Sequence, residues 1–315
     1  MLLTIRTILL FVLLAVNIFI LPVSATNTKA ADLNNTVETL YFMGYKDNKW
    51  ILFYKKINAA SFKSIETISE PRELYFSSEE NLIYYLDAES QLRKLALESN
   101  DSATGKQKET ILFTPSENDS YAQIYWDKAS GLLYLVKMPH GKSSEADIVV
   151  WDKGMMKAVV RQISSQFEPF IYDKRWLFYG HVHCSLDCGR IIQEIWRKNL
   201  ITGEAEQLSL LGQISRQAIV DNKGEWVYFS SNKEGTYHIW RQSLAHTNTL
   251  PVAQQVSIGE ATDTDPAVTS FNELFFIRHT PKGKTLLMKQ SKEGIMSLLP
   301  LPDGVSEIRN LRINQ

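Results

Sequence analysis

Residues 221–244 alternate between polar turns and short aromatic or β-branched segments. The segments Trp226–Phe229 and Tyr237–Trp240 contain side chains that fit a pleated sheet. The turns Asn222–Gly224 and Asn232–Gly235 contain Asn and Gly, which tolerate a positive φ. Because similar stretches follow one another along the chain, the pattern predicts a series of antiparallel β units.

These units repeat with a period of about 47 residues, which is within the range of repeat architectures. Each unit offers four strands, the content of one blade of a β-propeller. The first strands of successive units are predicted to begin near Glu73, Tyr121, Phe167, Ile214 and Asp263.

The two ends of the chain complete one blade together. The N-terminal unit supplies only three strands, Thr39–Tyr45, Lys49–Ile57 and Phe62–Ser69, and lacks an innermost one. The C-terminal segment Ser306–Ile313 is a spare strand that can fill the vacant position. Closure removes the unpaired strand edges that an open ring would expose. The sequence therefore predicts an all-β fold, a six-bladed β-propeller over residues 39–315.

The sequence pattern of the middle strands predicts that they are buried on both faces. The runs Trp176–Tyr179, Trp226–Phe229 and Leu274–Ile277 lack the polar alternation of a sheet with one solvated face. A blade between two neighbouring blades requires such runs, so we assign most aromatic residues to core packing.

Residues 1–25 have the pattern of a secretory signal peptide. Arg6 precedes the apolar run Ile8–Leu21, and Val23-Ser24-Ala25 is a small-residue cleavage site. The alternative is an uncleaved anchor, but the run is shorter than the roughly 20 residues of a membrane span. We expect a mature protein without a transmembrane span, which begins with the short segment 26–38. The expected location is the periplasm, with an extracellular location as the alternative.

Composition limits the classes of partner and cofactor. Lys plus Arg is 34 and Asp plus Glu is 35, which gives a formal net charge of -1. A nucleic-acid partner would require a clustered basic excess, so we exclude that class. The sequence has no nucleophile elbow, zinc helix, phosphate loop or sialidase Asp-box. We therefore predict no cofactor.

One unusual cluster, 181–189, contains both cysteines of the chain. Cys184 and Cys188 are expected to form a disulfide in an oxidising compartment, if the loop brings their Cα atoms within about 7 Å. Alternatively, His181 and His183 share a strand face and could bind a metal with Cys or Asp187. Free thiols are the third possibility.

The segment 221–244 resembles the repeat of the TolB-like propellers, in which a polar turn precedes an aromatic strand, an Asn-containing tip and an Ile-Trp strand. Ile195-Trp196 echoes Ile239-Trp240 of that segment. The pairs Glu70-Pro71, Glu168-Pro169 and Asp265-Pro266 echo the acidic-Pro pair that opens blades in the family. The resemblance covers the whole mature chain as architecture and about two blades as motif.

The resemblance implies a propeller whose central funnel binds a protein or peptide, as TolB-like propellers receive a peptidoglycan-associated lipoprotein. TolB itself carries an α/β domain before its propeller. Here only Thr26–Glu38 separate the predicted cleavage site from the first strand, so a full role in the Tol system is not expected.

The candidate binding residues are Glu70, Glu168, Arg216 and Asp265, which are expected near one mouth of the channel. An acid before Pro can also simply shape a turn and stay solvated. If these residues form the funnel rim, charge reversal there should weaken partner binding with little effect on folding.

We therefore expect a monomeric, exported, non-enzymatic propeller that binds an envelope protein or peptide. The alternative is a secreted propeller enzyme, a hydrolase, lactonase or lyase with its active site at the channel mouth. The first candidates for catalysis would be His181, His183, Glu168 and Asp265.

Overall fold

The computed structural model describes residues 38–97, 108–184, 189–245 and 251–314. The proposed signal peptide lies outside these residues, as do Cys188 and the side chain of Cys184. No helix in the described residues is long and apolar enough to cross a membrane.

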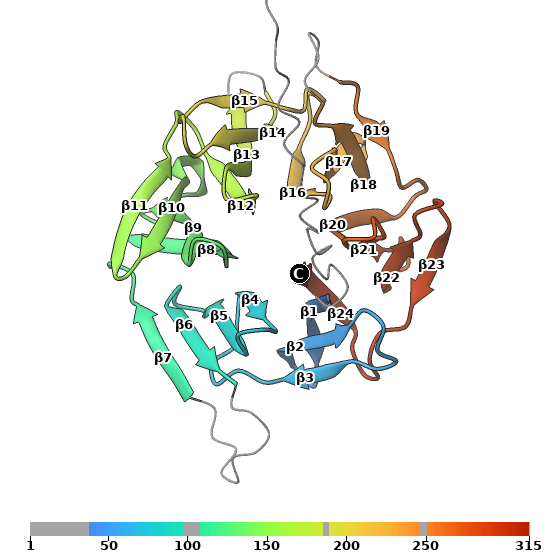
Figure 1. Ribbon diagram of the computed structural model, residues 1–315, viewed down its shortest axis with the longest axis horizontal. Coiled ribbons are helices and arrows are strands. Elements are labelled where there is room, and N and C mark those ends of the chain that lie inside the picture. The colour runs from blue at the N-terminus through green and yellow to red at the C-terminus, as the bar shows by residue number, and fades with distance from the viewer. Residues whose placement is uncertain (1–37, 98–107, 185–188, 246–250, 315) are drawn as a thin grey trace, which may run out of the picture. The chain divides into compact units, whose positions relative to one another are not determined.

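Six four-stranded antiparallel sheets follow one another around a ring (Figure 1). The predicted six-bladed β-propeller is therefore confirmed. In five sheets the strands follow chain order from the innermost outward, and in the sixth the last strand of the chain is innermost.

The strands of the closing blade are, from the inside outward, β24 (Glu307–Asn314), β1 (Thr39–Lys46), β2 (Lys49–Lys56) and β3 (Lys63–Ile65). The next two blades are β4 (Glu73–Ser77), β5 (Leu82–Leu86), β6 (Leu92–Ala96) and β7 (Lys108–Phe113), then β8 (Asp119–Asp127), β9 (Leu132–Pro139), β10 (Asp147–Asp152) and β11 (Met155–Val160), with the short 3-10 helix η1 (Ser143–Glu145) between β9 and β10. The last three are β12 (Gln166–Tyr172), β13 (Trp176–Cys184), β14 (Ile192–Asn199) and β15 (Ala205–Gln207), then β16 (Ser215–Val220), β17 (Trp226–Glu234), β18 (Thr236–Ser243) and β19 (Gln254–Gln255), then β20 (Thr262–Val268), β21 (Leu274–His279), β22 (Thr285–Gln290) and β23 (Met296–Leu299).

The ring closes as the chain ends predict. Strand β24 pairs antiparallel with β1, with Ile308 opposite Gly44 and Ile313 opposite Leu40. The N–H of Ser306 donates to the carbonyl of Tyr45 at 3.0 Å and extends this pairing toward the loop.

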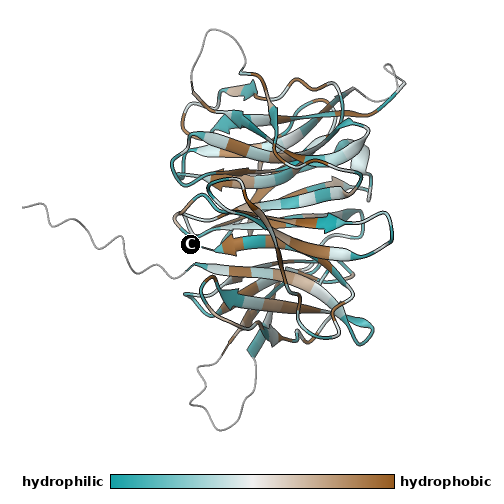
Figure 2. Cartoon of the chain, turned by 90° about the vertical axis from the view of Figure 1, so that its right-hand side faces the viewer, coloured by the Kyte–Doolittle hydropathy of each residue, from teal (hydrophilic) through white to brown (hydrophobic). Residues whose placement is uncertain are grey.

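The cores lie within and between neighbouring blades. Leu177 and Tyr179 of β13 are fully buried, and they pack in one cluster with Val136 and Ile148 of the preceding blade. Figure 2 shows the sheets from the side, with apolar stretches within the strands. Continuous apolar runs in the middle strands are thus explained by burial on both faces.

Polar side chains and glycine residues in the turns determine the conformation of the hairpins. In the turn between β16 and β17, the Asp221 carboxylate accepts the N–H groups of Glu225 and Trp226 at 2.8 and 3.0 Å. Gly224 has φ 69 there, and a Cβ atom at this position would lie 2.7 Å from the Tyr172 hydroxyl. Glycine is therefore required both by the backbone conformation and by the neighbouring blade.

Candidate functional site

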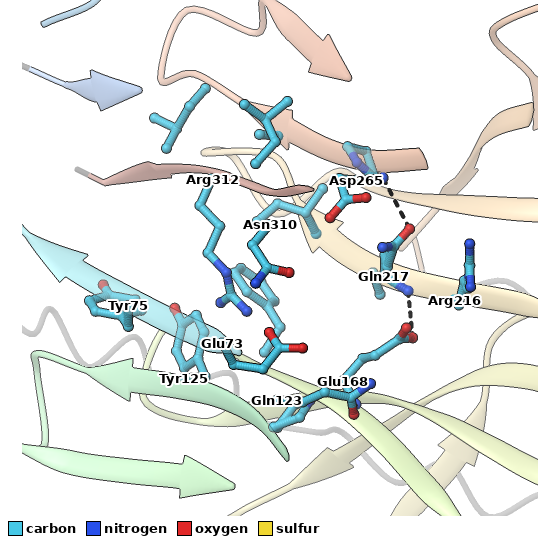
Figure 3. Close-up of a pocket in the computed structure, with 18 of the residues that line it drawn as sticks. Glu73, Tyr75, Gln123, Tyr125, Glu168, Arg216, Gln217, Asp265, Asn310 and Arg312 are labelled. Carbon is cyan, nitrogen blue, oxygen red and sulfur yellow. Dashed lines mark hydrogen bonds between the residues drawn. The ribbon is translucent and has the colours of Figure 1, made fainter. Parts of the chain in front are cut away.

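The innermost strands line a cavity of about 300 Å³ at the centre of the ring. Its wall comes from β4, β8, β12, β16, β20 and β24, with Tyr41 added from β1 (Figure 3). This volume is at the lower end of pockets that bind small ligands, roughly 300–1,000 Å³. Carboxylates, guanidinium groups, amides and aromatic rings line it, unlike the apolar interiors of the blades.

Five of the six innermost strands carry a β-bulge, and each bulge holds a polar residue with a positive φ. A bulge redirects side chains and twists its strand, and it is often found near binding sites. Here it turns the polar side chains toward the cavity (Figure 3). We call these residues the bulge collar: Gln123 (φ 52), Glu168 (φ 59), Gln217 (φ 59), Asp265 (φ 52) and Asn310 (φ 54).

Hydrogen bonds link four members of the collar in series. The N–H of Glu168 donates to Oε1 of Gln123 at 2.7 Å, and the N–H of Gln217 donates to Oε2 of Glu168 at 2.7 Å. The N–H of Asp265 donates to Oε1 of Gln217 at 3.0 Å. Because a bulge disrupts the ladder locally, its N–H needs another acceptor, and the side chain of the preceding blade supplies it. The collar thus joins four blades along the channel wall.

The sixth innermost strand, β4, pairs with β5 without a bulge. Its first residue, Glu73, contributes a carboxylate to the cavity. Burial raises the pKa of Glu73 and outweighs the opposite effect of Arg312 and Arg309, while the Asp265 carboxylate raises this pKa further. With Glu73, the cavity lining has three carboxyl groups and two arginines.

Glu168 has the most perturbed carboxyl of the cavity. Burial raises its pKa to about 7, and the Asp265 and Glu73 carboxylates act in the same direction. The N–H of Gln217 and the charge of Arg216 lower this pKa but do not compensate for burial. The Glu168 carboxyl can therefore gain or lose a proton near neutral pH.

Two arginines border the cavity. The guanidinium of Arg216 lies 4.4 Å from the centre of the Tyr237 ring, a cation–π contact. The guanidinium of Arg312 lies 5.9 Å from the Tyr125 ring and points toward Glu73 (Figure 3).

Aromatic side chains form the wall on the side of β4 and β8. The rings of Tyr75 and Tyr125 meet edge to face at 5.7 Å, and Phe170 meets Tyr125 in the same way at 5.3 Å. The Tyr75 hydroxyl donates to Oδ1 of Asn314 at 3.0 Å, and the Tyr125 hydroxyl donates to the carbonyl of Ile171 at 3.2 Å. These bonds fix the rings as a rigid surface.

Three of the four residues proposed for the funnel, Glu168, Arg216 and Asp265, line this cavity. The fourth, Glu70, is exposed in the segment before β4 and is not among the lining residues. The pairs Glu168-Pro169 and Asp265-Pro266 fall in bulges of innermost strands, whereas Glu70-Pro71 precedes a strand that has no bulge. The acidic-Pro pair therefore occurs in two different structural positions.

Sequence reasoning missed several residues of the cavity. No single residue type is common to all of them, so no motif connects them, although the collar members recur at intervals of about 47 residues. Only an alignment of the units by strand register could have found them: Glu73, Gln123, Gln217, Asn310 and Arg312.

The histidine cluster lies in β13, outside the cavity lining. His181 is buried, with Nδ1 3.3 Å from Nε2 of Gln166, and burial lowers its pKa. The ring centres of His181 and exposed His183 are 6.2 Å apart. Among the residues described, no three His, Cys, Asp or Glu side chains are arranged to hold a metal ion. Asp187, Cys188 and the Cys184 side chain are not described, so the disulfide stays a prediction.

Comparison with solved structures identifies the fold. TolB from Acinetobacter baumannii superimposes with a TM-score of 0.64 at 14% sequence identity, over 88% of this chain and 66% of that one. The chain has the TolB-like six-bladed propeller fold. It spans slightly less than two thirds of the Acinetobacter protein. No protein-family model matches the sequence, and no curated protein does.

Two further solved structures are similar as well. Putative TolB from Agrobacterium tumefaciens has a TM-score of 0.56 at 10% identity, over 83% of this chain and 87% of that one. The oligogalacturonate lyase of Vibrio parahaemolyticus has a TM-score of 0.56 at 12% identity, over 85% and 78% of the two chains. At sequence identities this low, the structural similarity establishes the fold alone. Any argument about function must come from the residues of the cavity.

Proposed function

We propose that this chain is an exported propeller that binds a protein or peptide of the bacterial envelope in its central channel, without catalysing a reaction. The observation that carries the proposal is the convergence of charged side chains from several blades on one cavity. Blade interiors, in contrast, are filled with apolar side chains. The similarity to TolB propellers in fold supports a partner-binding role.

Export rests on the signal-peptide pattern of residues 1–25. We propose the periplasm as the location. Cell fractionation followed by N-terminal sequencing of the mature protein tests this part, with Thr26 expected as the first residue. A protein that retains Met1 in the cytoplasmic fraction would contradict it.

Charge reversal within the cavity tests partner binding. The double variant Arg216→Glu/Asp265→Lys keeps the net charge and leaves every side-chain acceptor of the collar in place. The matched control is Arg175→Glu/Asp303→Lys, which makes the same changes at exposed positions outside the cavity.

Envelope proteins retained on the immobilised wild type and on both variants are compared by quantitative mass spectrometry. We expect a partner that the wild type and the control retain and the cavity variant loses. Equal retention by a cavity variant with an unchanged melting temperature would refute the proposal.

A propeller enzyme is the second candidate, favoured by one observation. The Glu168 carboxyl, with a pKa raised to about 7, suits proton transfer near neutral pH. Of the other candidates for catalysis, Asp265 lines the cavity, whereas His181 and His183 do not. A lyase acting on acidic oligosaccharides fits poorly, because the cavity holds three carboxylates against two guanidinium groups. Incubation with oligogalacturonate, followed by ultraviolet absorbance of unsaturated products, tests this alternative.

A further inference from the structure

The bulge collar limits which cavity groups can contact a ligand. Gln123, Glu168 and Gln217 each use a side-chain oxygen to accept the N–H of the next blade's bulge. A ligand that displaced one of these oxygens would leave a backbone N–H without its acceptor. These three oxygens therefore belong to the framework of the ring, and a ligand contacts other polar atoms of the cavity.

Other charged groups of the cavity have no such structural role. Among the described residues, Arg216 finds no hydrogen-bond partner for its Nε and lies against the Tyr237 ring, which leaves Asp265 and Arg312 to be considered. Within the described part of the chain, the Asp265 carboxylate and the Arg312 guanidinium make no hydrogen bond or ion pair. The hydrogen bond between Asp265 and Gln217 uses the backbone N–H of Asp265, and the Arg312 guanidinium lies 5.9 Å from the centre of the Tyr125 ring. Both side chains reach the cavity (Figure 3). A ligand of complementary charge would supply the partners that they lack.

The signs of these charges restrict the ligand. A guanidinium group binds a planar carboxylate through two parallel hydrogen bonds, so Arg312 selects an anionic group. A ligand with negative charge alone would meet repulsion from Glu73, Glu168 and Asp265. A positive group beside the ligand's carboxylate would remove the repulsion.

We propose that the cavity binds a zwitterionic group, with its carboxylate on Arg312 and its cationic group facing Asp265 and Glu73. This inference rests on the proposed role of the channel as the binding site. A cavity of about 300 Å³ takes a group of residue size rather than a folded domain. The last residue of a peptide that ends in lysine supplies both charges, and so does free lysine.

Isothermal titration calorimetry of the exported protein measures how much each charge of the ligand contributes to binding. The probes are acetyl-Gly-Gly-Lys, its C-terminal amide, acetyl-Gly-Gly-Leu and free lysine. The amide lacks the anion, the leucine peptide lacks the cation, and free lysine distinguishes an amino acid from a peptide end. The variants are Arg312→Gln and Asp265→Asn, and the controls Arg175→Gln and Asp303→Asn remove the same charges at exposed sites.

We expect acetyl-Gly-Gly-Lys or free lysine to bind about tenfold or more tightly than the amide and the leucine peptide. Arg312→Gln should abolish the preference for the free carboxylate, Asp265→Asn should weaken the preference for lysine, and both controls should bind like the wild type. Equal binding of all probes, no binding, or unchanged binding by Arg312→Gln would overturn the inference. The retention experiment with the Arg216→Glu/Asp265→Lys variant separates the two proposals. If that variant loses the envelope partner although the calorimetry contradicts the inference, the proposed function stands and only the ligand chemistry is wrong.

Discussion

The carboxylate of Glu168 accepts the backbone N–H of Gln217 at 2.7 Å, although the two residues are 49 positions apart. The bond joins innermost strands β12 and β16 of neighbouring blades at their bulges. Glu168 is thus part of the framework of the ring as well as of the cavity wall. The expectation that substitutions at every funnel residue would leave folding unaffected therefore does not extend to Glu168.

Replacement of Glu168 by alanine should lower the free energy of unfolding. The N–H of Gln217 would lose its acceptor, which costs about 1–3 kcal/mol, toward the lower end here because the cavity is open to water. Glu168→Gln keeps an acceptor oxygen and should lose less. Urea denaturation measures both, with Glu79→Ala, an exposed acid paired with Lys128, as the surface control. If Glu168→Ala unfolds at the same urea concentration as the wild type, the bond contributes nothing to stability.

The same carboxyl should make stability depend on pH. Its pKa rises from 4.5 to about 7 on folding, so between these values the folded protein holds a proton that the unfolded chain has released. The free energy of unfolding therefore falls as pH rises from about 4.5 to about 7. Burial raises the pKa of Glu73 as well, which acts in the same direction.

Glu168→Gln provides the comparison, because its amide does not titrate. We expect the unfolding free energy of the wild type, relative to this variant, to decrease by about 1–3 kcal/mol across that pH window, below the full value of the shift because water reaches the cavity. Urea denaturation at a series of pH values gives the two curves. Parallel curves would show that Glu168 has an ordinary pKa in the folded protein.

Strand patterns predicted the middle of each blade better than its outer edge. The strands that start at Trp176, Trp226 and Leu274 begin where the aromatic runs predict. The predicted outermost strand Phe62–Ser69 forms ladder pairs only at Lys63–Ile65. An outermost strand has one neighbour and a solvated side, so its side chains determine its length weakly.

The cavity was less predictable than the fold for a physical reason. A bulge shifts the alternation of side chains by one position, so periodicity does not reveal which residue of an innermost strand faces the channel. Glu168 and Asp265 were found because an acid precedes proline in each case. Gln217 and Arg312 carry no such mark, and their role emerges only when the strands are placed in register.

The predicted disulfide between Cys184 and Cys188 is tested by mass spectrometry of the exported protein. We expect a mass two hydrogens below that of the dithiol, because export exposes the pair to an oxidising compartment. The closed loop is short, so Cys188→Ser should reduce stability by no more than about 2–3 kcal/mol. Two free thiols in the non-reduced protein, or a metal retained after dialysis, would exclude the disulfide.

Closure of the ring by β24 should contribute strongly to stability. Ile308 and Leu311 of this strand are buried with Phe42 and Phe53 of the strands β1 and β2. Deletion of residues 305–315 would expose the edge of β1 and remove this packing, and we expect a loss of several kcal/mol and of solubility.

A milder test of the same closure is Leu311→Ala, which should cost about 2–5 kcal/mol because the side chain is 3% exposed. Leu298→Ala is the matched control on the outermost strand β23, where the side chain is 57% exposed, and it should change stability by less than about 0.5 kcal/mol. Melting temperatures compare the variants. If the truncated protein and Leu311→Ala both melt like the wild type, β24 does not close the ring in solution, and the first blade must obtain its inner edge in another way.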